Sequence, residues 1–181
     1  MTWSVDGKNY VHERATATQQ TGFSFVAQCR SWLPNAFGGI FWFGVDDAAS
    51  CCYVPMFCGI NEIPMEYAEG NGSMVEYSNT AAFWTFTKVS NFVYSRYSDM
   101  IKHVNDKQAY WEGKFVKEIN DMSAKMKDLC EKNPEQARKA LNSYSVSAAK
   151  NVCADWNDLF IYLLVKYNDG NVKKEENGKF K

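Results

Sequence analysis

The sequence is short of several residue types on which common protein functions depend. Only two histidines and four prolines occur in 181 residues, and basic and acidic side chains nearly cancel to a formal net charge of −1. With a pI near 6.1, the chain has no electrostatic feature that favours nucleic acid. No apolar run approaches the roughly 18 residues that span a bilayer. We therefore expect neither a nucleic-acid partner nor a membrane partner.

Signature motifs of several enzyme classes are also missing. The sequence holds no HExxH, no glycine-rich phosphate loop and no GxSxG, which removes the usual signals for zinc peptidases, nucleotide sites and serine hydrolases. Three of the six cysteines are close in sequence, at positions 51, 52 and 58, but their spacing fits no common zinc site. We expect no metal site and no cofactor.

The cysteines permit two interpretations. Buried free thiols that pack as small hydrophobic groups are the expected role of all six. The alternative is a redox pair at Cys51 and Cys52, which adjacent residues form only through a strained ring. A cysteine peptidase needs its nucleophile beside a base, yet no local signature joins His12 or His103 to any cysteine. We expect both histidines to be packed or solvated.

The first part of the chain, residues 1–65, is predicted to be rich in strands. A turn is expected at Asp6 and Gly7. Residues 23–28 alternate between aromatic or small side chains and a second face of mixed character. The apolar run 40–45 is typical of a buried strand, and Pro55 predicts an edge strand or a bulge.

From about residue 78 the period changes, and residues 78–168 are predicted to form three long helices. Ser78 or Asn79 is expected to cap the first, whose apolar residues continue at three- and four-residue steps as far as Ile101. A second stripe begins at Trp111. The third helix starts at the sequence NPEQ, with Asn133 as its cap. Residues 171–181 are expected to form a flexible tail.

This order of elements predicts an α+β fold in which an antiparallel sheet packs against long C-terminal helices. Polar side chains follow one predicted strand directly, at Asp46 and Asp47. These carboxylates are expected either to cap a turn, with Arg30 as an ion-pair partner, or to bind a ligand. The aromatic stripe of the sheet either lines a groove or packs the core, and Trp32 or Trp42 is the one expected at the surface.

Three segments carry a resemblance to a known family: TQQTGFSFVAQCRSWLP, GGIFWFGVDDA and SAAKNVCADWNDLFIYLLVKYNDG. Together they resemble the bacterial PepD-like dipeptidases, which belong to the N-terminal-nucleophile hydrolase superfamily. The likeness extends over essentially the whole chain. It implies a cysteine-type peptidase that hydrolyses short peptides, built as a four-layer αββα sandwich, and a periplasmic or secreted location.

The resemblance also implies what this chain lacks. The family nucleophile is a cysteine at the mature N-terminus, whose free amino group takes up the thiol proton. Here residue 1 is methionine, and MTWSVDG resembles an internal stretch without a signal peptide. We therefore expect residues 1–181 to be the C-terminal portion of a dipeptidase domain, with no catalytic residue and no activity alone.

Several partners follow from this interpretation. The full enzyme would bind a dipeptide or short peptide, with Asp46, Asp47 and Trp32 as the candidate substrate-binding residues. An ammonium group of the substrate would pair with one of the aspartates. The N-terminal portion of the same enzyme would cover the sheet, and the uncovered chain is expected to form a homo-oligomer. A non-enzymatic interaction or assembly module remains the alternative.

Overall fold

The structure is a computed structural model that describes residues 2–11 and 15–180. It confirms the α+β fold: every sheet in the described residues pairs antiparallel, and long helices occupy the C-terminal half. No described helix is both long and apolar enough to cross a membrane.

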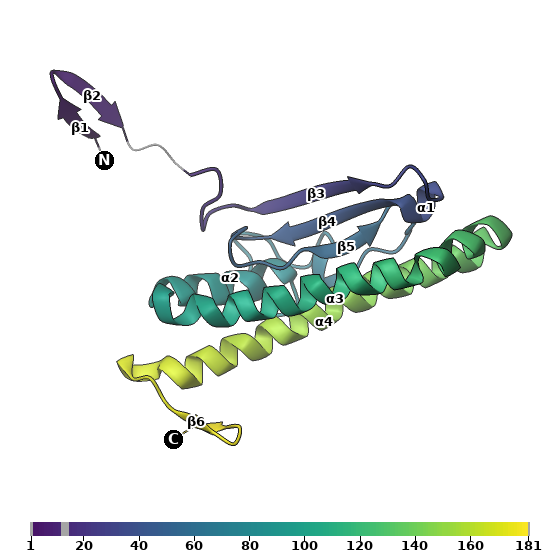
Figure 1. Cartoon of the computed structure of the whole chain (residues 1–181). Coiled ribbons are helices and arrows are strands. Elements are labelled where there is room, and N and C mark those ends of the chain that lie inside the picture. Colours follow the sequence, from purple (N-terminus) through teal and green to yellow (C-terminus); the bar gives the residue numbers. More distant parts are fainter. Residues whose placement is uncertain (1, 12–14, 181) are drawn as a thin grey trace.

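The predicted turn at Asp6 and Gly7 forms an N-terminal hairpin. Strand β1 (Thr2–Val5) pairs with β2 (Lys8–Val11), and the two turn residues have φ angles of 52° and 74°. Left-handed backbone at both central positions matches the twist of a two-residue hairpin. Figure 1 shows this hairpin standing apart from the rest of the molecule.

The central sheet has three strands in the order β3 (Phe23–Cys29), β4 (Gly39–Val45) and β5 (Val54–Phe57). A short helix, α1 (Asn35–Gly38), connects the first two strands. Pro55 lies in β5 at one edge of this sheet, as predicted, because a proline cannot donate a hydrogen bond to a further strand.

The register of the sheet fixes its two faces. Odd-numbered residues of β3 pair with odd-numbered residues of β4, and even with even. One face, here called the aromatic face, carries the rings of Phe23, Phe25, Phe41 and Phe43. The opposite face carries Trp42 and Ile40 and packs toward the helices, with Ile40 in a buried cluster that includes Ile119.

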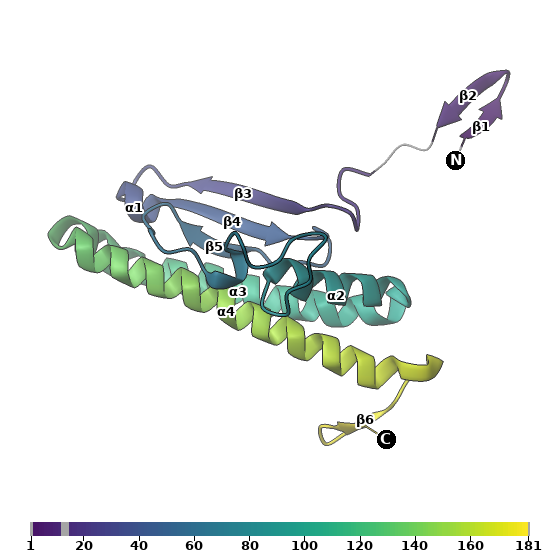
Figure 2. The ribbon, with the colours of Figure 1, turned by 180° about the vertical axis from the view of Figure 1, so that it is seen from behind.

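Three helices follow the sheet: α2 (Ala82–Tyr94), α3 (Tyr97–Lys132) and α4 (Pro134–Tyr167). Figure 1 shows α3 and α4 as two long helices lying side by side below the sheet. The loop between β5 and α2 includes the 3₁₀ turn η1 (Met65–Tyr67). In the reverse view of Figure 2, this loop lies in front of the central sheet.

The core joins the helices to the inner residues of the sheet. Its larger part is built mainly from α2, α3 and α4, and its largest fully buried side chain is Trp156 of α4. A smaller cluster around Phe37 and Leu141 closes the far end. Each fully buried large side chain contributes about 1.5–3 kcal/mol through removal of apolar surface from water.

The predicted boundary between the first two helices is wrong. The apolar spacing continues to Ile101, but the chain breaks at Ser95 and Arg96, where Arg96 has φ −153° and ψ 60°. The Ser95 hydroxyl donates to the Phe92 carbonyl at 2.6 Å, and the Arg96 guanidinium bonds Asp99. These bonds satisfy polar groups at a helix end that no apolar pattern reveals.

The predicted cap of the first helix is also wrong. Helix α2 begins after Ala81, which makes no side-chain cap bond. The Ser78 hydroxyl instead donates to the Asn71 side chain at 2.6 Å, within the preceding loop. Serine side chains bond loop backbone and side chains as readily as helix ends, so Ser78 marked a loop rather than a cap.

The start of α4 is confirmed. The Asn133 side chain accepts from the backbone N–H of Gln136 at 3.1 Å, and Pro134 occupies the first turn. This is the expected chemistry of an N-cap followed by proline. The helix ends at Tyr167, and the 3₁₀ turn η2 (Asn168–Gly170) follows.

The last residues form a second small hairpin, from β6 (Glu175–Glu176) and β7 (Lys179–Phe180). Tyr162 of α4 holds it, because its hydroxyl donates to Glu175 at 3.1 Å and its ring lies 5.3 Å from that of Phe180. Flexibility of the segment 171–181 stays a prediction.

The central sheet is uncovered along strand β3, and this part of it is called the open side below. Strand β3 has no neighbour on its outer edge among the described residues, and all but one of its side chains are exposed, Phe25 to 52%. The described residues form a single layer of sheet covered by helices. A second sheet layer, as in an αββα sandwich, stays a prediction.

Candidate functional site

Asp46 and Asp47 directly follow the central strand β4, as predicted, and their side chains contact α2. Both are buried, with 4% and 1% of their surface exposed. Asp46 has φ +67°, a left-handed conformation that aspartate adopts more readily than most residues. After this turn, the two carboxylates accept hydrogen bonds from different sets of residues.

Asp46 binds two hydroxyl groups of α2. Its Oδ1 accepts from Thr87 at 3.0 Å and its Oδ2 from Ser90 at 2.5 Å. Burial raises the pKa of Asp46, and the hydrogen bond from Ser90 works against this rise. The carboxylate therefore ties the end of β4 to the helix behind it.

Asp47 closes the turn that follows. Its Oδ1 accepts from the Ala49 N–H at 3.1 Å, and its Oδ2 accepts from the hydroxyls of Ser50 at 3.2 Å and Tyr94 at 2.9 Å. The hydrogen bond to Asp47 comes second after burial among the causes that raise the pKa of Tyr94 to about 12. Turn capping, one of the two roles expected for this pair, is what these contacts provide.

The predicted ion pair between Arg30 and these aspartates is wrong. Arg30 Nε donates to the Gly38 carbonyl at 3.3 Å, and Nη2 donates to the Phe37 carbonyl at 2.5 Å. The guanidinium also lies 4.6 Å from the centre of the Phe37 ring. Arg30 follows β3 directly, so its side chain meets the carbonyl groups at the end of α1 rather than the far end of β4.

The partners of the aspartates were missed by sequence reasoning. Thr87, Ser90 and Tyr94 follow one another at three- and four-residue steps on α2, so they lie on one helix face. The buried Ser90 sits among apolar neighbours. A buried hydroxyl in an apolar stripe was the available signal, because such groups require a hydrogen-bond partner.

Trp32 lies apart from this cluster, on the connection between β3 and α1, with 71% of its surface exposed. Of the two candidates, Trp32 is the surface tryptophan, since Trp42 is half-buried. Binding of a substrate by Asp46, Asp47 and Trp32 stays a prediction. A ligand ammonium would have to displace hydroxyl partners of buried carboxylates.

The cysteines are all free. Cys51, Cys52 and Cys153 are buried, as expected for thiols that pack as hydrophobic groups, and no disulfide joins Cys51 to Cys52. Burial raises the pKa of Cys51 and of Cys153 to about 12. Cys29 and Cys58 are exposed, which corrects the expectation that all six would be buried.

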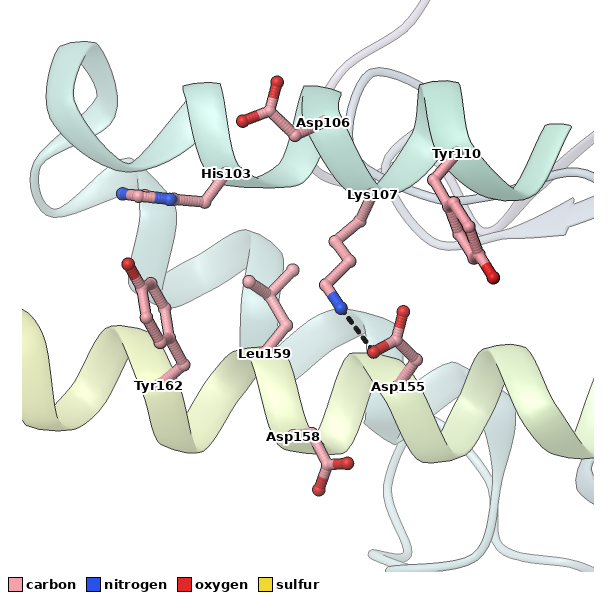
Figure 3. Close-up of a pocket in the computed structure, with 8 residues that line it drawn as sticks. All are labelled: His103, Asp106, Lys107, Tyr110, Asp155, Asp158, Leu159 and Tyr162. Atoms are coloured by element: carbon pink, nitrogen blue, oxygen red, sulfur yellow. Dashed lines mark hydrogen bonds and ion pairs between the residues drawn. The ribbon is translucent and has the colours of Figure 1, made fainter. Parts of the chain in front are cut away.

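A cavity of about 650 Å³ opens between α3 and α4. Figure 3 shows Lys107 reaching across it to Asp155, an ion pair of 2.5 Å. The same carboxylate accepts from the Trp111 indole at 2.7 Å. Both partners of Asp155 lie on the facing helix, so this carboxylate links α4 to α3.

His103 lies at one end of that cavity, where Figure 3 shows it above Tyr162. Its Nε2 is 3.0 Å from the Tyr167 hydroxyl. Burial, and then the charge of Lys166, lower the pKa of His103, so the imidazole is neutral at pH 7. It is packed, as predicted, and no cysteine lines the cavity. His12 lies outside the described residues.

The described residues hold no group of three or more histidine, cysteine, aspartate or glutamate side chains placed to bind a metal ion. The arrangement around Asp46 and Asp47 offers carboxylates and hydroxyls but no nucleophile beside a base. Chemically, this end of the sheet can recognise or position a polar group.

Comparison with known proteins connects this fold to a family. A search of curated proteins found no match. The family model described as peptidase family C69, the PepD-like dipeptidase family, matches residues 4–112. That range contains the central sheet, both aspartates and the first half of α3, and it leaves α4 outside. Because the match covers more than half of the chain, the protein belongs to peptidase family C69.

Proposed function

We propose that this chain is the C-terminal part of a cysteine-type dipeptidase that hydrolyses short peptides. The match of residues 4–112 to a peptidase family carries the reaction class. In amide hydrolysis by a cysteine enzyme, a thiolate attacks the carbonyl carbon and the carbon–nitrogen bond breaks, so the amine leaves with a proton and an acyl-enzyme remains; water then cleaves this thioester to release the acid and restore the thiol. The chain supplies the scaffold of that site.

The environments of the cysteines support a catalytic nucleophile that lies outside residues 1–181. A thiolate is the reactive form, and burial raises the pKa values of Cys51, Cys52 and Cys153. Cys29 and Cys58 are exposed, but no hydrogen bond in the described part of the chain joins either of them to a histidine. Burial raises the pKa of Cys130 as well, so none of the six cysteines is prepared for attack.

A second candidate function is an interaction or assembly module, favoured by the open side of the sheet. The aromatic face and the unpaired edge of β3 form an apolar surface without a single charged side chain on the strand. Such edges invite pairing with another polypeptide. In the dipeptidase account that polypeptide is the N-terminal portion of the same enzyme.

The experiment is a peptide hydrolysis assay of the purified chain. Dipeptides are incubated with residues 1–181, and free amino acids are quantified against a buffer blank. The proposal predicts no release above the blank. Hydrolysis that is lost in Cys29→Ala or Cys58→Ala would overturn the external nucleophile, and hydrolysis that survives both would point to a different nucleophile within the chain.

A further inference from the structure

A groove runs between β3 and α3 on the face of the sheet opposite the aromatic face. It consists of two adjoining cavities of about 350 and 250 Å³, which share Val26, Trp42 and Val116. These three side chains make its middle apolar. The name β3–α3 groove is used below for this surface.

Arg30 lies at one end of the groove. Only 7% of its surface is exposed, and none of the ion pairs among the described residues includes it. Two of its five N–H groups bond the carbonyls of Phe37 and Gly38. A largely buried cation without a carboxylate is costly, and the unused donors suit an anion.

Gln28 adds a second donor at the same end. Its Oε1 accepts from the Trp42 indole at 3.0 Å. This bond fixes the orientation of the amide, because an indole N–H can only donate. The Nε2 group of Gln28 is therefore the part left to bind a ligand, and its two hydrogens are both donors. Arg30 and Gln28 line the same cavity, so both can donate to a carboxylate that binds there.

Glu112 lies at the other end, beside Tyr53. One carboxylate oxygen accepts from the Tyr53 N–H at 3.2 Å. Burial raises the pKa of Glu112, and no ion pair of the described residues includes it. The groove thus has an unpaired cation at one end and an unpaired anion at the other.

The length of the groove limits the ligand. On α3 it extends from Glu112 to Asn120, two turns of helix, or about 12 Å at 1.5 Å per residue. An extended peptide advances about 3.3 Å per residue. A peptide of roughly three or four residues therefore reaches from one charged end to the other.

We propose that the β3–α3 groove binds a short zwitterionic peptide with its C-terminal carboxylate on Arg30 and Gln28. Its amino terminus lies toward Glu112, and its apolar side chains pack on Trp42 and Val116. The choice of a peptide rests on the proposed function. The charges and the apolar floor are complementary to this class of ligand independently of any catalysis.

Calorimetric titration of the purified chain tests this directly. The probe is the tetrapeptide Gly-Val-Val-Leu as the free acid, compared with the same peptide carrying a C-terminal amide. The free acid is expected to bind at least about tenfold more tightly, because the amide removes a charge-assisted pair. Equal affinities, or no binding of the free acid at millimolar concentration, would overturn the proposal.

Two variants locate the site. Arg30→Met should abolish the preference for the free acid, but it also removes the bonds to α1, so its fold must be checked by circular dichroism. Val116→Glu places a negative charge on an exposed helix position inside the groove and should weaken free-acid binding about tenfold. The matched control is Ile161→Glu, exposed on α4, which should bind like the wild type.

Different results would overturn the peptidase proposal and the proposal of a peptide site in the β3–α3 groove. Calorimetry detects binding without bond cleavage, whereas the hydrolysis assay reports turnover. If Val116→Glu leaves binding of the free-acid peptide unchanged, the groove is not the peptide site, and the peptidase proposal is unaffected. Hydrolysis by a cysteine of this chain would overturn the external nucleophile and leave the groove untouched.

Discussion

The hydroxyl of Ser90 on α2 donates to Oδ2 of Asp46 at 2.5 Å, across 44 positions of sequence. This bond joins the end of the central strand to the first long helix. Both groups are buried, so removal of either one costs the other a hydrogen-bond partner: Asp46 keeps the Thr87 hydroxyl, and the Ser90 hydroxyl keeps the Thr87 carbonyl at 3.2 Å. The stability of the chain therefore depends on the contact, and substitutions at Asp46 distinguish a structural role from a substrate-binding role.

Asp46→Ala is expected to destabilise the chain by about 2 kcal/mol, since it removes the acceptor of the Thr87 hydroxyl and the shorter of the two bonds of the Ser90 hydroxyl, and places alanine at a positive φ. Asp46→Asn keeps an acceptor and tolerates that conformation, so it should cost less than about 1 kcal/mol. Urea unfolding followed by circular dichroism measures both. A neutral Asp46→Ala would show that the carboxylate is not structural.

The same residue has a predictable pH dependence. Burial raises the pKa of Asp46 above its ordinary value of 3.8, so the folded chain holds this proton more tightly than the unfolded chain. The contribution of Asp46 to stability is full below pH 3.8 and is lost as the pH rises through the raised pKa. The free energy of unfolding of the wild type should therefore fall relative to that of Asp46→Asn as the pH rises from 3.8 through the raised pKa. A difference between the two free energies that does not change with pH would contradict the raised pKa of Asp46.

Two glycines offer a matched pair of alanine substitutions. A Cβ at Gly44 in β4 would lie 2.7 Å from Cys51 Sγ and 3.4 Å from the Tyr53 ring, so Gly44→Ala should cost about 1–3 kcal/mol. Gly113 lies within α3 with nothing within 4 Å of such a Cβ, and Gly113→Ala should stabilise the chain by about 1 kcal/mol. Thermal unfolding that gives both variants the same sign would contradict this packing.

The thiols should divide into two classes. Cys29 and Cys58 are exposed, whereas burial raises the pKa of Cys51 and of Cys153 to about 12. With iodoacetamide at pH 8, the first two should be alkylated in the native chain and the buried ones only after denaturation. Peptide mass mapping identifies the modified positions. Native alkylation of Cys51 would mean that the end of β4 opens readily.

The aromatic face gives a prediction about association. We propose that purified chains form a homo-oligomer through the open side of the sheet, because exposed apolar strand edges pair readily. Phe25→Lys should weaken association at least about tenfold, and Val75→Lys, in an exposed loop, serves as the control for added charge. Sedimentation equilibrium at tens of micromolar checks this. A monomeric wild type would contradict the proposal.

Local chemistry allowed some elements to be predicted from the sequence. The start of α4 depends on Asn133 and Pro134 alone, and the hairpin turn on Asp6 and Gly7, so neighbouring residues were sufficient. The edge position of Pro55 followed from its missing N–H. The sequence could not show that Ser145 of α4 donates to the Pro55 carbonyl at 2.9 Å, because this contact spans 90 residues.

The errors arose where distant contacts decide the local structure. The break before α3 is stabilised by Arg96, which bonds the Gly170 carbonyl at 3.0 Å from 74 positions away. Opposite charges close together in sequence suggest an ion pair between Arg30 and the aspartates. The path of the chain instead places it against α1, and that placement creates the unpaired charge of the β3–α3 groove.

Covalent trapping tests most directly whether the nucleophile lies outside this chain. A dipeptidyl chloromethyl ketone is incubated with the purified chain, and intact-mass spectrometry follows adduct formation beside a parallel reaction with iodoacetamide. Our account predicts that the peptidyl reagent labels the exposed Cys29 and Cys58 with no preference over iodoacetamide. Rapid stoichiometric labelling of one cysteine by the peptidyl reagent alone, blocked by excess dipeptide, would contradict it.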